Sequence, residues 1–367
     1  MTVPIEAVQH LIFIKPQSIM KRLLFLLSLL TAPLAQSQEL ESILLAAQDA
    51  ERLTQDYIEP ALKGLVYSMN EGWYTTGKTH SVLGFDVTFG ANMALVPNND
   101  KNFLFRASEY NYVRSQVGDT ESVSTVLGDD PDGTFFDVRV PVGDGTFKVA
   151  EFQMPGGIGP DFPLKGVATP MIQFGIGLPT STDLKIRFLP NIGVNDKVKN
   201  FMYGVGLQHD LTQYIPGLSV TPFSLSALVA YSNTKVTYKI DDEDDLDDVS
   251  VVNGEGLFAL NTLSFQAIGS VNLAIFDFYA SAGYGRGGSR LELNGDYTLT
   301  YALEDGNGMS LGQINETITN PLQFKTDVNS PRFGLGMRMN LAIFKLFASY
   351  TIQEYNTFST GISVSVR

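Results

Sequence analysis

The feature that most constrains this chain is the alternation of side chains in segments such as residues 84–97, GFDVTFGANMALVP. One side of this segment would carry only apolar residues: Phe85, Val87, Phe89, Ala91, Met93 and Leu95. The other side would carry small and polar residues such as Asp86, Thr88 and Asn92. A period of two residues is that of a β-strand and not that of an α-helix. The segment is therefore predicted to be a strand with one apolar face and one polar face.

The same pattern recurs along most of the chain after residue 81. Clear examples are residues 199–208, 223–231, 276–285, 333–341 and 358–366, and noisier ones lie near 101–113, 170–178, 183–189, 257–271, 290–301, 321–328 and 344–354. The total is roughly 12–14 strands of about ten residues, which is the length a tilted strand needs to cross a bilayer.

A soluble sandwich of two sheets also alternates, but its outer face carries many charged side chains. Here the polar face is mostly Gly, Ser, Asn and Thr, and aromatic residues gather on the other face. Strands in lipid must close on themselves, because no backbone group can stay unpaired there. The predicted fold class is therefore all-β: a closed antiparallel transmembrane β-barrel of about 12–14 strands with an N-terminal amphipathic helical segment.

Connection lengths differ between the two ends of the predicted strands. NLAIF occurs twice, at Asn272–Phe276 and Asn340–Phe344, and LPTSTD at 178–183 is a third short connection. By contrast, residues 114–168, 241–255 and 303–320 are long, polar and rich in Asp and Gly. Short periplasmic turns and long external loops are the usual asymmetry of outer-membrane barrels.

The N-terminal part predicts export. From Met20 the sequence reads MKRLLFLLSLLTAPLAQSQ, a basic start, an apolar stretch and small residues, as in a secretory signal peptide cleaved near Ser37. The start is either Met1 or Met20. The predicted segments are residues 1–37 (upstream residues and signal peptide), 38–80 (a helical plug or periplasmic segment, with Pro60 breaking or kinking the helix) and 81–367 (the barrel). The predicted location is the cell outer membrane.

Composition excludes several function classes. The chain has 25 Lys and Arg against 39 Asp and Glu, a formal net charge of −14, which argues against nucleic-acid binding. The lack of cysteine fits an oxidising envelope compartment. After signal removal only His80 and His209 remain, and Asp210 points away from its neighbour His209 on a strand, so no catalytic dyad is predicted. We predict no enzyme activity, no cofactor and no metal.

Two motifs suggest other chemistry. GYGRGG at 283–288 matches a dinucleotide-binding glycine pattern, but the residues after it alternate like a strand, so small lumen-side residues running into a turn are the better interpretation. DDEDDLDD at 241–248 resembles a calcium loop, yet Leu246 stands where that loop needs glycine. A solvated external loop is the expected state.

Charged residues on the polar face are the candidate functional residues. By strand parity, Asp86, Lys185, Arg187, Asp277 and Arg338 would face the lumen. Lumen charges either tune the selectivity of a barrel or brace its interior through ion pairs. The sequence leaves both roles open.

Two stretches carry a resemblance to a known family. NEGWYTTGKTHSVLGFDVTFGANMALVP and GVGLQHDLTQYIPG resemble an uncharacterised family of Gram-negative outer-membrane barrel proteins. More distantly, a helical segment before a barrel is similar to the FadL-type long-chain fatty-acid channels, in which the N-terminal segment forms a hatch inside the lumen. The Asn-Pro-Ala signature of those channels is absent, since the only Asn-Pro, at Asn320, continues to Leu322.

The predicted function is passive or gated passage of a small solute. The architecture allows this solute to be hydrophobic. The expected partners are outer-membrane lipid, the barrel-assembly machinery and this small hydrophobic solute, with no nucleic acid. A structural or adhesive barrel with acidic external loops, and a lipid-modifying enzyme, are the alternatives. Architecture alone does not decide among them.

Overall fold

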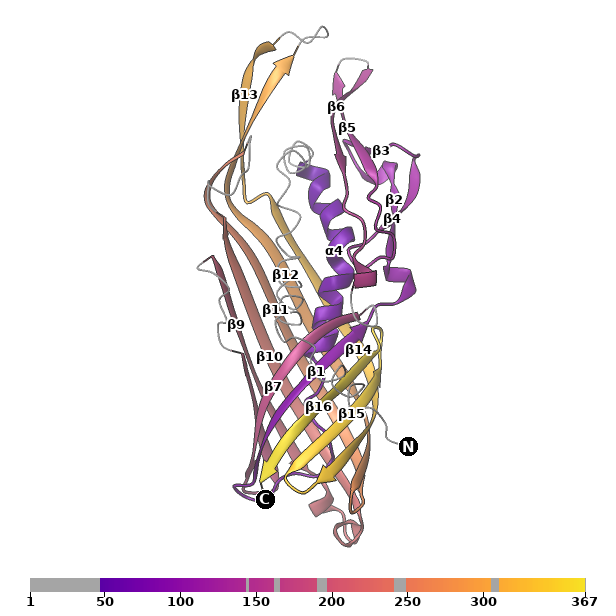
Figure 1. Ribbon diagram of the computed structural model, residues 1–367, viewed down its shortest axis with the longest axis vertical. Helices are drawn as coiled ribbons and strands as arrows, with labels where there is room; N and C mark the ends of the chain where they lie inside the picture. Colours follow the sequence, from indigo (N-terminus) through magenta and orange to yellow (C-terminus); the bar gives the residue numbers. More distant parts are fainter. Residues whose placement is uncertain are drawn as a thin grey trace, which may run out of the picture.

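A computed structural model describes residues 47–142, 145–161, 166–189, 197–240, 249–304 and 310–366. Ten of the eleven strands in the main sheet form one closed antiparallel barrel (Figure 1). In order around the ring they are β1 (Phe85–Leu95), β7 (Gly166–Leu178), β8 (Thr182–Leu189), β9 (Val198–Asp210), β10 (Phe223–Ile240), β11 (Val249–Asn272), β12 (Phe276–Glu304), β14 (Leu322–Leu341), β15 (Phe344–Ile352) and β16 (Thr357–Val366). Pairing of β1 with β16, from Phe85 opposite Val366 to Ala94 opposite Thr357, closes the ring.

The predicted all-β closed antiparallel barrel is confirmed, but it has fewer strands than the roughly 12–14 expected from sequence. Residues 276–285 and 290–301 belong to the single strand β12, and residues 321–328 and 333–341 belong to β14. The glycine motif at 283–288 therefore lies inside a continuous strand, and the turn expected there is wrong. Residues 101–113 lie outside the barrel, so three of the expected strands disappear from the ring.

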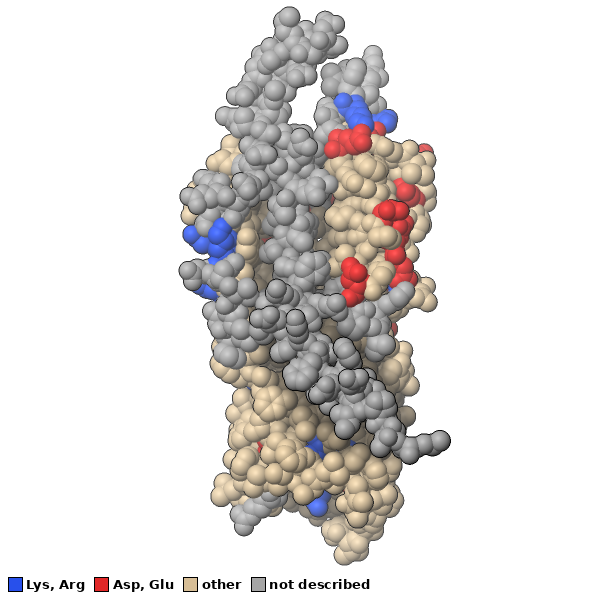
Figure 2. Space-filling view, in the orientation of Figure 1, with Lys and Arg blue, Asp and Glu red and all other residues tan. Residues whose placement is uncertain are grey.

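The outer surface of the barrel is apolar, as the alternation predicts. Exposed aromatic rings pack against each other across neighbouring strands, with ring centroids 5.8 Å apart for Phe188 and Phe201 and 6.3 Å apart for Tyr203 and Tyr231. Figure 2 shows that the lower part of the described surface on this face carries very few charged side chains, whereas they gather higher up. Such a band is typical of a lipid-facing barrel wall.

The three short connections predicted from sequence are hairpin turns. They join β11 to β12, β14 to β15 and β7 to β8, and all lie at the end of the barrel where β16 also ends (Figure 1). The β9–β10 connection at this end contains two short helices, η6 (Thr212–Tyr214) and η7 (Leu218–Val220). We call this the turn end and the opposite one the loop end.

At the loop end, the connection between β1 and β7 folds into small sheets of its own. One pairs β2 (Asn102–Arg106) with β4 (Thr120–Ser124), and the other contains β3 (Val113–Ser115), β5 (Phe135–Val142) and β6 (Gly145–Gln153). Three short helices interrupt it: η2 (Asn98–Asp100), η3 (Ala107–Glu109) and η4 (Gly159–Asp161). A further strand, β13 (Ser310–Thr319), pairs with the outer end of β12. Residues 241–248 lie outside the described residues.

One long helix, α4 (Ala47–Met69), enters the lumen from the loop end (Figure 1). It contacts β14, β7, β1, β12 and β11, which lie on opposite sides of the ring. Of the break or kink expected at Pro60, the break is wrong, because Pro60 lies inside the continuous helix α4. An interior proline costs about 3 kcal/mol, and burial of residues on both sides of it, such as Leu53 and Leu62, offsets this cost.

Among the described residues, no helix combines the length and the apolarity needed to cross a bilayer. The predicted signal peptide and the start of the helical segment, residues 1–46, lie outside the described residues.

Candidate functional site

Residues 70–84, which we call the hatch segment, run from the end of α4 through the lumen to the start of β1. The backbone of Asn70 still bonds to the carbonyl of Val66, at 3.2 Å, and the backbone of Leu83 bonds to the carbonyl of Gly177 on β7, at 2.8 Å. Between these two points, the described backbone makes no backbone hydrogen bond to a barrel strand. The hatch segment is therefore held by side chains and not by a β-ladder.

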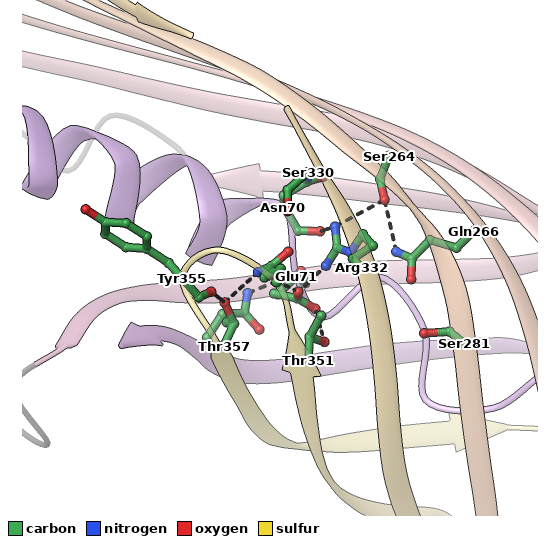
Figure 3. A network of polar contacts seen from close by, with 12 residues as sticks. Asn70, Glu71, Ser264, Gln266, Ser281, Ser330, Arg332, Thr351, Tyr355 and Thr357 are labelled. Carbon is green, nitrogen blue, oxygen red and sulfur yellow. Dashed lines mark hydrogen bonds and ion pairs between the residues drawn. The ribbon is translucent and has the colours of Figure 1, made fainter. Parts of the chain in front are cut away.

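The first layer of contacts joins Glu71 to the wall (Figure 3). Glu71 forms an ion pair with Arg332 on β14, whose side chain is 0 % exposed. Arg332 also donates a hydrogen bond to the carbonyl of Asn70, at 3.2 Å. Thr351 Oγ1 and Gln353 Nε2 donate to the Glu71 carboxylate at 3.1 and 3.3 Å. A buried ion pair with further hydrogen bonds becomes costly when one partner is removed.

A second arginine supports the only tryptophan of the chain. The guanidinium of Arg187 on β8 lies 3.8 Å from the ring centre of Trp73, which is 0 % exposed. Arg187 also donates to the carbonyls of Met69, at 3.1 Å, and Glu71, at 2.7 Å, and to Gln173 Oε1, at 3.1 Å. A cation over an indole face is a stabilising arrangement. These contacts fix the chain as it leaves α4.

Towards the turn end, the hatch segment contacts the wall through hydroxyl, amide and imidazole groups. Tyr74 donates a hydrogen bond to Gln266 Oε1 at 2.8 Å, and Thr76 Oγ1 lies 3.3 Å from Ser270 Oγ. His80 Nδ1 lies 2.9 Å from Asp183 on β8. All these partners are side chains on the polar face of the barrel strands.

A pocket, which we call the vestibule, lies between the hatch segment and the wall. Its atom-free space is about 390 Å³ when the open solvent at its mouth is counted. The hatch segment contributes Tyr74, Thr75, Thr76, Lys78 and His80, and the wall contributes Asp86, Thr88, Gln173, Asp183, Lys185, Arg338, Lys345, Ser363 and Ser365. Most of these side chains are charged or carry hydroxyl groups, so the vestibule is polar.

The structure brings together most of the residues singled out from sequence. Asp86, Lys185 and Arg338 line the vestibule, and Arg338 Nε bonds to Asp277 at 2.9 Å. Arg187 lies deeper, under Trp73. Arg338 and Asp277 are neighbours on β14 and β12, so this pair braces two wall strands.

Three residues that anchor the hatch segment to the wall were missed by sequence reasoning. Arg332 follows the parity of β14, and extending the predicted strand by one residue would have placed it in the lumen. Glu71 and His80 lie in the irregular hatch segment, where no periodic signal exists. Their roles depend on contacts with distant strands.

The second histidine lies apart from the lumen contacts. His209 Nδ1 lies 2.8 Å from Thr182 Oγ1, and its Nε2 lies 3.0 Å from the hydroxyl of Tyr214. Asp210 instead accepts a hydrogen bond from the backbone of Thr212, at 2.7 Å. In the described part of the chain, no group of three or more His, Asp or Glu residues is placed to hold a metal ion.

Residues 19–366 match DUF6588, a family of unknown function. The chain belongs to this family. The resemblance to an uncharacterised barrel family is thereby confirmed. No match was found among curated proteins.

Solved structures similar to this DUF6588 protein are barrels. They include Ail, the attachment invasion locus protein of Yersinia pestis (8 % identity, TM-score 0.25, 78 % of this chain and 100 % of that chain). The translocator domain of autotransporter NalP from Neisseria meningitidis has 12 % identity and a TM-score of 0.23, over 88 % of this chain and 99 % of that one. The Pseudomonas putida toluene transporter TodX has 8 % identity and a TM-score of 0.21, over 77 % and 89 %. Such distant likenesses carry no argument about function.

Proposed function

We propose that this DUF6588 protein is an outer-membrane β-barrel that passes a small solute when its hatch segment detaches from the wall. The apolar band of the barrel and the predicted signal peptide support the location. One observation carries the proposal of gating. Between Glu71 and Val82, the hatch segment lies in the lumen through side-chain contacts with the wall and makes no backbone hydrogen bond to a barrel strand.

The kind of contact determines which interactions must break when the hatch segment leaves the wall. A segment paired into a sheet loses its backbone hydrogen bonds when it leaves, whereas side-chain contacts such as Thr76 with Ser270 can be exchanged for water. Release of the hatch segment therefore leaves the barrel ladder intact. The barrel itself does not need to unfold for the lumen to open.

The lining supports a polar solute more than the hydrophobic one that the architecture alone allows. Lys185, Asp86 and Arg338 line the vestibule together with threonine and serine hydroxyls. Polar groups inside a barrel favour water-filled passage. An apolar solute would leave them without partners.

Cysteine locking tests the proposal directly, since the chain has no native cysteine. Thr76 Oγ1 and Ser270 Oγ are 3.3 Å apart, so the Thr76→Cys, Ser270→Cys variant needs only a small shift to form an S–S bond of about 2.05 Å. We expect the oxidised variant to conduct at least about tenfold less than its reduced form in planar bilayers, because a tenfold drop corresponds to only about 1.4 kcal/mol of added hatch stability.

The matched control joins two strands without touching the hatch segment. Thr298 and Thr317 are opposite each other on β12 and β13, with their hydroxyls 2.8 Å apart. Oxidation of the Thr298→Cys, Thr317→Cys variant should leave conductance unchanged. Wild-type protein that never conducts, or a locked variant that conducts like its reduced form, would overturn gated passage.

A structural or adhesive role is the second candidate, and one observation favours it. The connection between β1 and β7 builds a cap at the loop end, whose buried aromatic rings of Phe105, Phe136 and Phe152 pack together in the core that the cap shares with α4. A plain loop would not need such a core. Lack of conductance together with cell-surface binding lost on deletion of this cap would favour adhesion.

A further inference from the structure

The vestibule carries more positive than negative groups. Its lining includes four cationic side chains, those of Lys78, Lys185, Arg338 and Lys345, against two carboxylates, those of Asp86 and Asp183. This balance is opposite to that of the whole chain, whose formal net charge is −14. The vestibule is thus a local basic site in an acidic protein.

Most of the charged groups there already have partners. Arg338 is bound to Asp277, and Lys345 Nζ donates to the carbonyl of Ala342 at 2.7 Å. Asp183 accepts hydrogen bonds from the backbone and the ring of His80, both at 2.9 Å. Asp86 accepts a hydrogen bond from Thr88 at 2.6 Å, and its other oxygen lies 3.7 Å from His80 Nε2.

Lys185 is the exception. Its side chain is buried, at 6 % exposure, and lines the vestibule, yet among the described residues it has no hydrogen bond and no ion pair within 4.0 Å. Asp183 on the same strand interacts with this ammonium electrostatically, but the two side chains make no direct contact. A buried ammonium without a direct partner is costly. A ligand that supplies a direct anionic partner would reduce this cost.

No side chain lies opposite Lys185 in the strand register. Its register partners on the two flanking strands are Gly175 on β7 and Gly206 on β9, neither of which has a side chain. Trp73 occupies part of the space over Gly206, where a Cβ atom would lie 3.0 Å from the indole. Asp86 Oδ1 occupies the space over Gly175, and the Lys185 side chain lines the vestibule.

We propose that the vestibule binds a small oxyanion, a carboxylate or phosphate group, through Lys185, with Lys78 as the second cation. The hydroxyls of Ser363 and Ser365 line the same space and supply neutral donors. This inference rests on the proposed function and names the class of solute for it. Hydrogen bonds to charged groups are the strong ones, so Lys185 dominates the affinity.

Calorimetric titration of the detergent-solubilised full chain tests this site. The probes are inorganic phosphate and succinate, used separately, which distinguishes phosphate from carboxylate binding. Loss of one charge-assisted contact should weaken binding about tenfold or more in Lys185→Gln. Lys185→Arg keeps the charge and should bind within a few-fold of wild type. Lys235→Gln, a loss of charge at an exposed position of β10, is the matched control and should bind like wild type.

A second readout comes from Trp73, because it is the only tryptophan and lies over Gly206, the register partner of Lys185. Anion binding should change its emission in wild type and in Lys235→Gln but not in Lys185→Gln. Binding of neither probe to wild type, or equal binding by wild type and Lys185→Gln, would overturn the site. Because the titration needs no membrane and no open lumen, it can fail while gated passage holds, and the reverse also applies.

Discussion

The two halves of the lumen are filled by different balances of apolar and polar contacts. In the loop-end half, α4 packs through buried apolar side chains such as Leu53, Leu62 and Val66 into one core with the cap between β1 and β7. In the turn-end half, the hatch segment is held largely by polar contacts, such as those of Glu71 with Arg332 and of His80 with Asp183, together with a smaller apolar cluster around Trp73 and Tyr74. The lumen is thus filled by an apolar core at the loop end and largely by polar contacts at the turn end.

This difference predicts that α4 stays in the lumen while the hatch segment can leave it. Apolar burial is lost in proportion to the area exposed, so moving α4 would expose a large core to water. Polar contacts lose much less when they are exchanged for water, because water replaces the partners. We therefore expect the hatch segment to move while α4 stays in place.

The largest effect should come from removing Glu71. In Glu71→Ala the guanidinium of Arg332 stays buried without its carboxylate, which should cost about 3–5 kcal/mol. Urea unfolding in lipid vesicles measures the loss, and acrylamide quenching of Trp73 shows whether the hatch segment has detached. The double variant Glu71→Leu, Arg332→Met removes both charges and should recover most of the loss. Unchanged stability in Glu71→Ala would mean that this polar contact does not hold the hatch segment.

Truncating a side chain in the apolar half should reduce stability by a similar or somewhat smaller amount, but it should not detach the hatch segment. Leu62→Ala removes a side chain that is 1 % exposed and should cost about 2–5 kcal/mol. Leu104→Ala at a position on β2 that is 47 % exposed should change stability by no more than about 0.5 kcal/mol. Trp73 quenching before unfolding should stay at the wild-type level in both. Equal exposure of Trp73 in Leu62→Ala and Glu71→Ala would break the distinction between the halves.

The smallest effect should come from the turn that leads into the hatch segment. Gly72 has φ +76°, and a Cβ atom there would lie 2.6 Å from Asn92 Oδ1 and 2.8 Å from Met171 Sδ. Gly217 has φ +81° with nothing within 4 Å, so Gly217→Ala measures the backbone cost alone, about 1–2 kcal/mol. Gly72→Ala should lose more than this in unfolding experiments and raise Trp73 quenching. Equal losses in the two variants would show that the lumen tolerates movement at Gly72.

The strand count shows that the local alternation of side chains is not sufficient to predict where a strand ends. Alternation identified the strands but could not show that β12 runs on through its glycines. Gly285 and Gly287 face α4 and the hatch segment, where Cβ atoms would lie 2.7 Å from Asn70 and 2.5 Å from Val66. These glycines allow α4 and the hatch segment to approach β12 closely. From the sequence alone, glycines of this kind cannot be distinguished from glycines of a turn.

The sequence by itself determined the all-β fold and the two faces of each strand, because neighbouring side chains on a strand point to opposite sides whatever the rest of the chain does. It thereby assigned Asp86 and Lys185 to the polar face. Only the tertiary structure decided which charges meet, because Glu71 and Arg332 are 261 residues apart and their contact depends on the path of the hatch segment. That path leaves Lys185 without a hydrogen bond or ion pair among the described residues, and its register partners on the two flanking strands are both glycines.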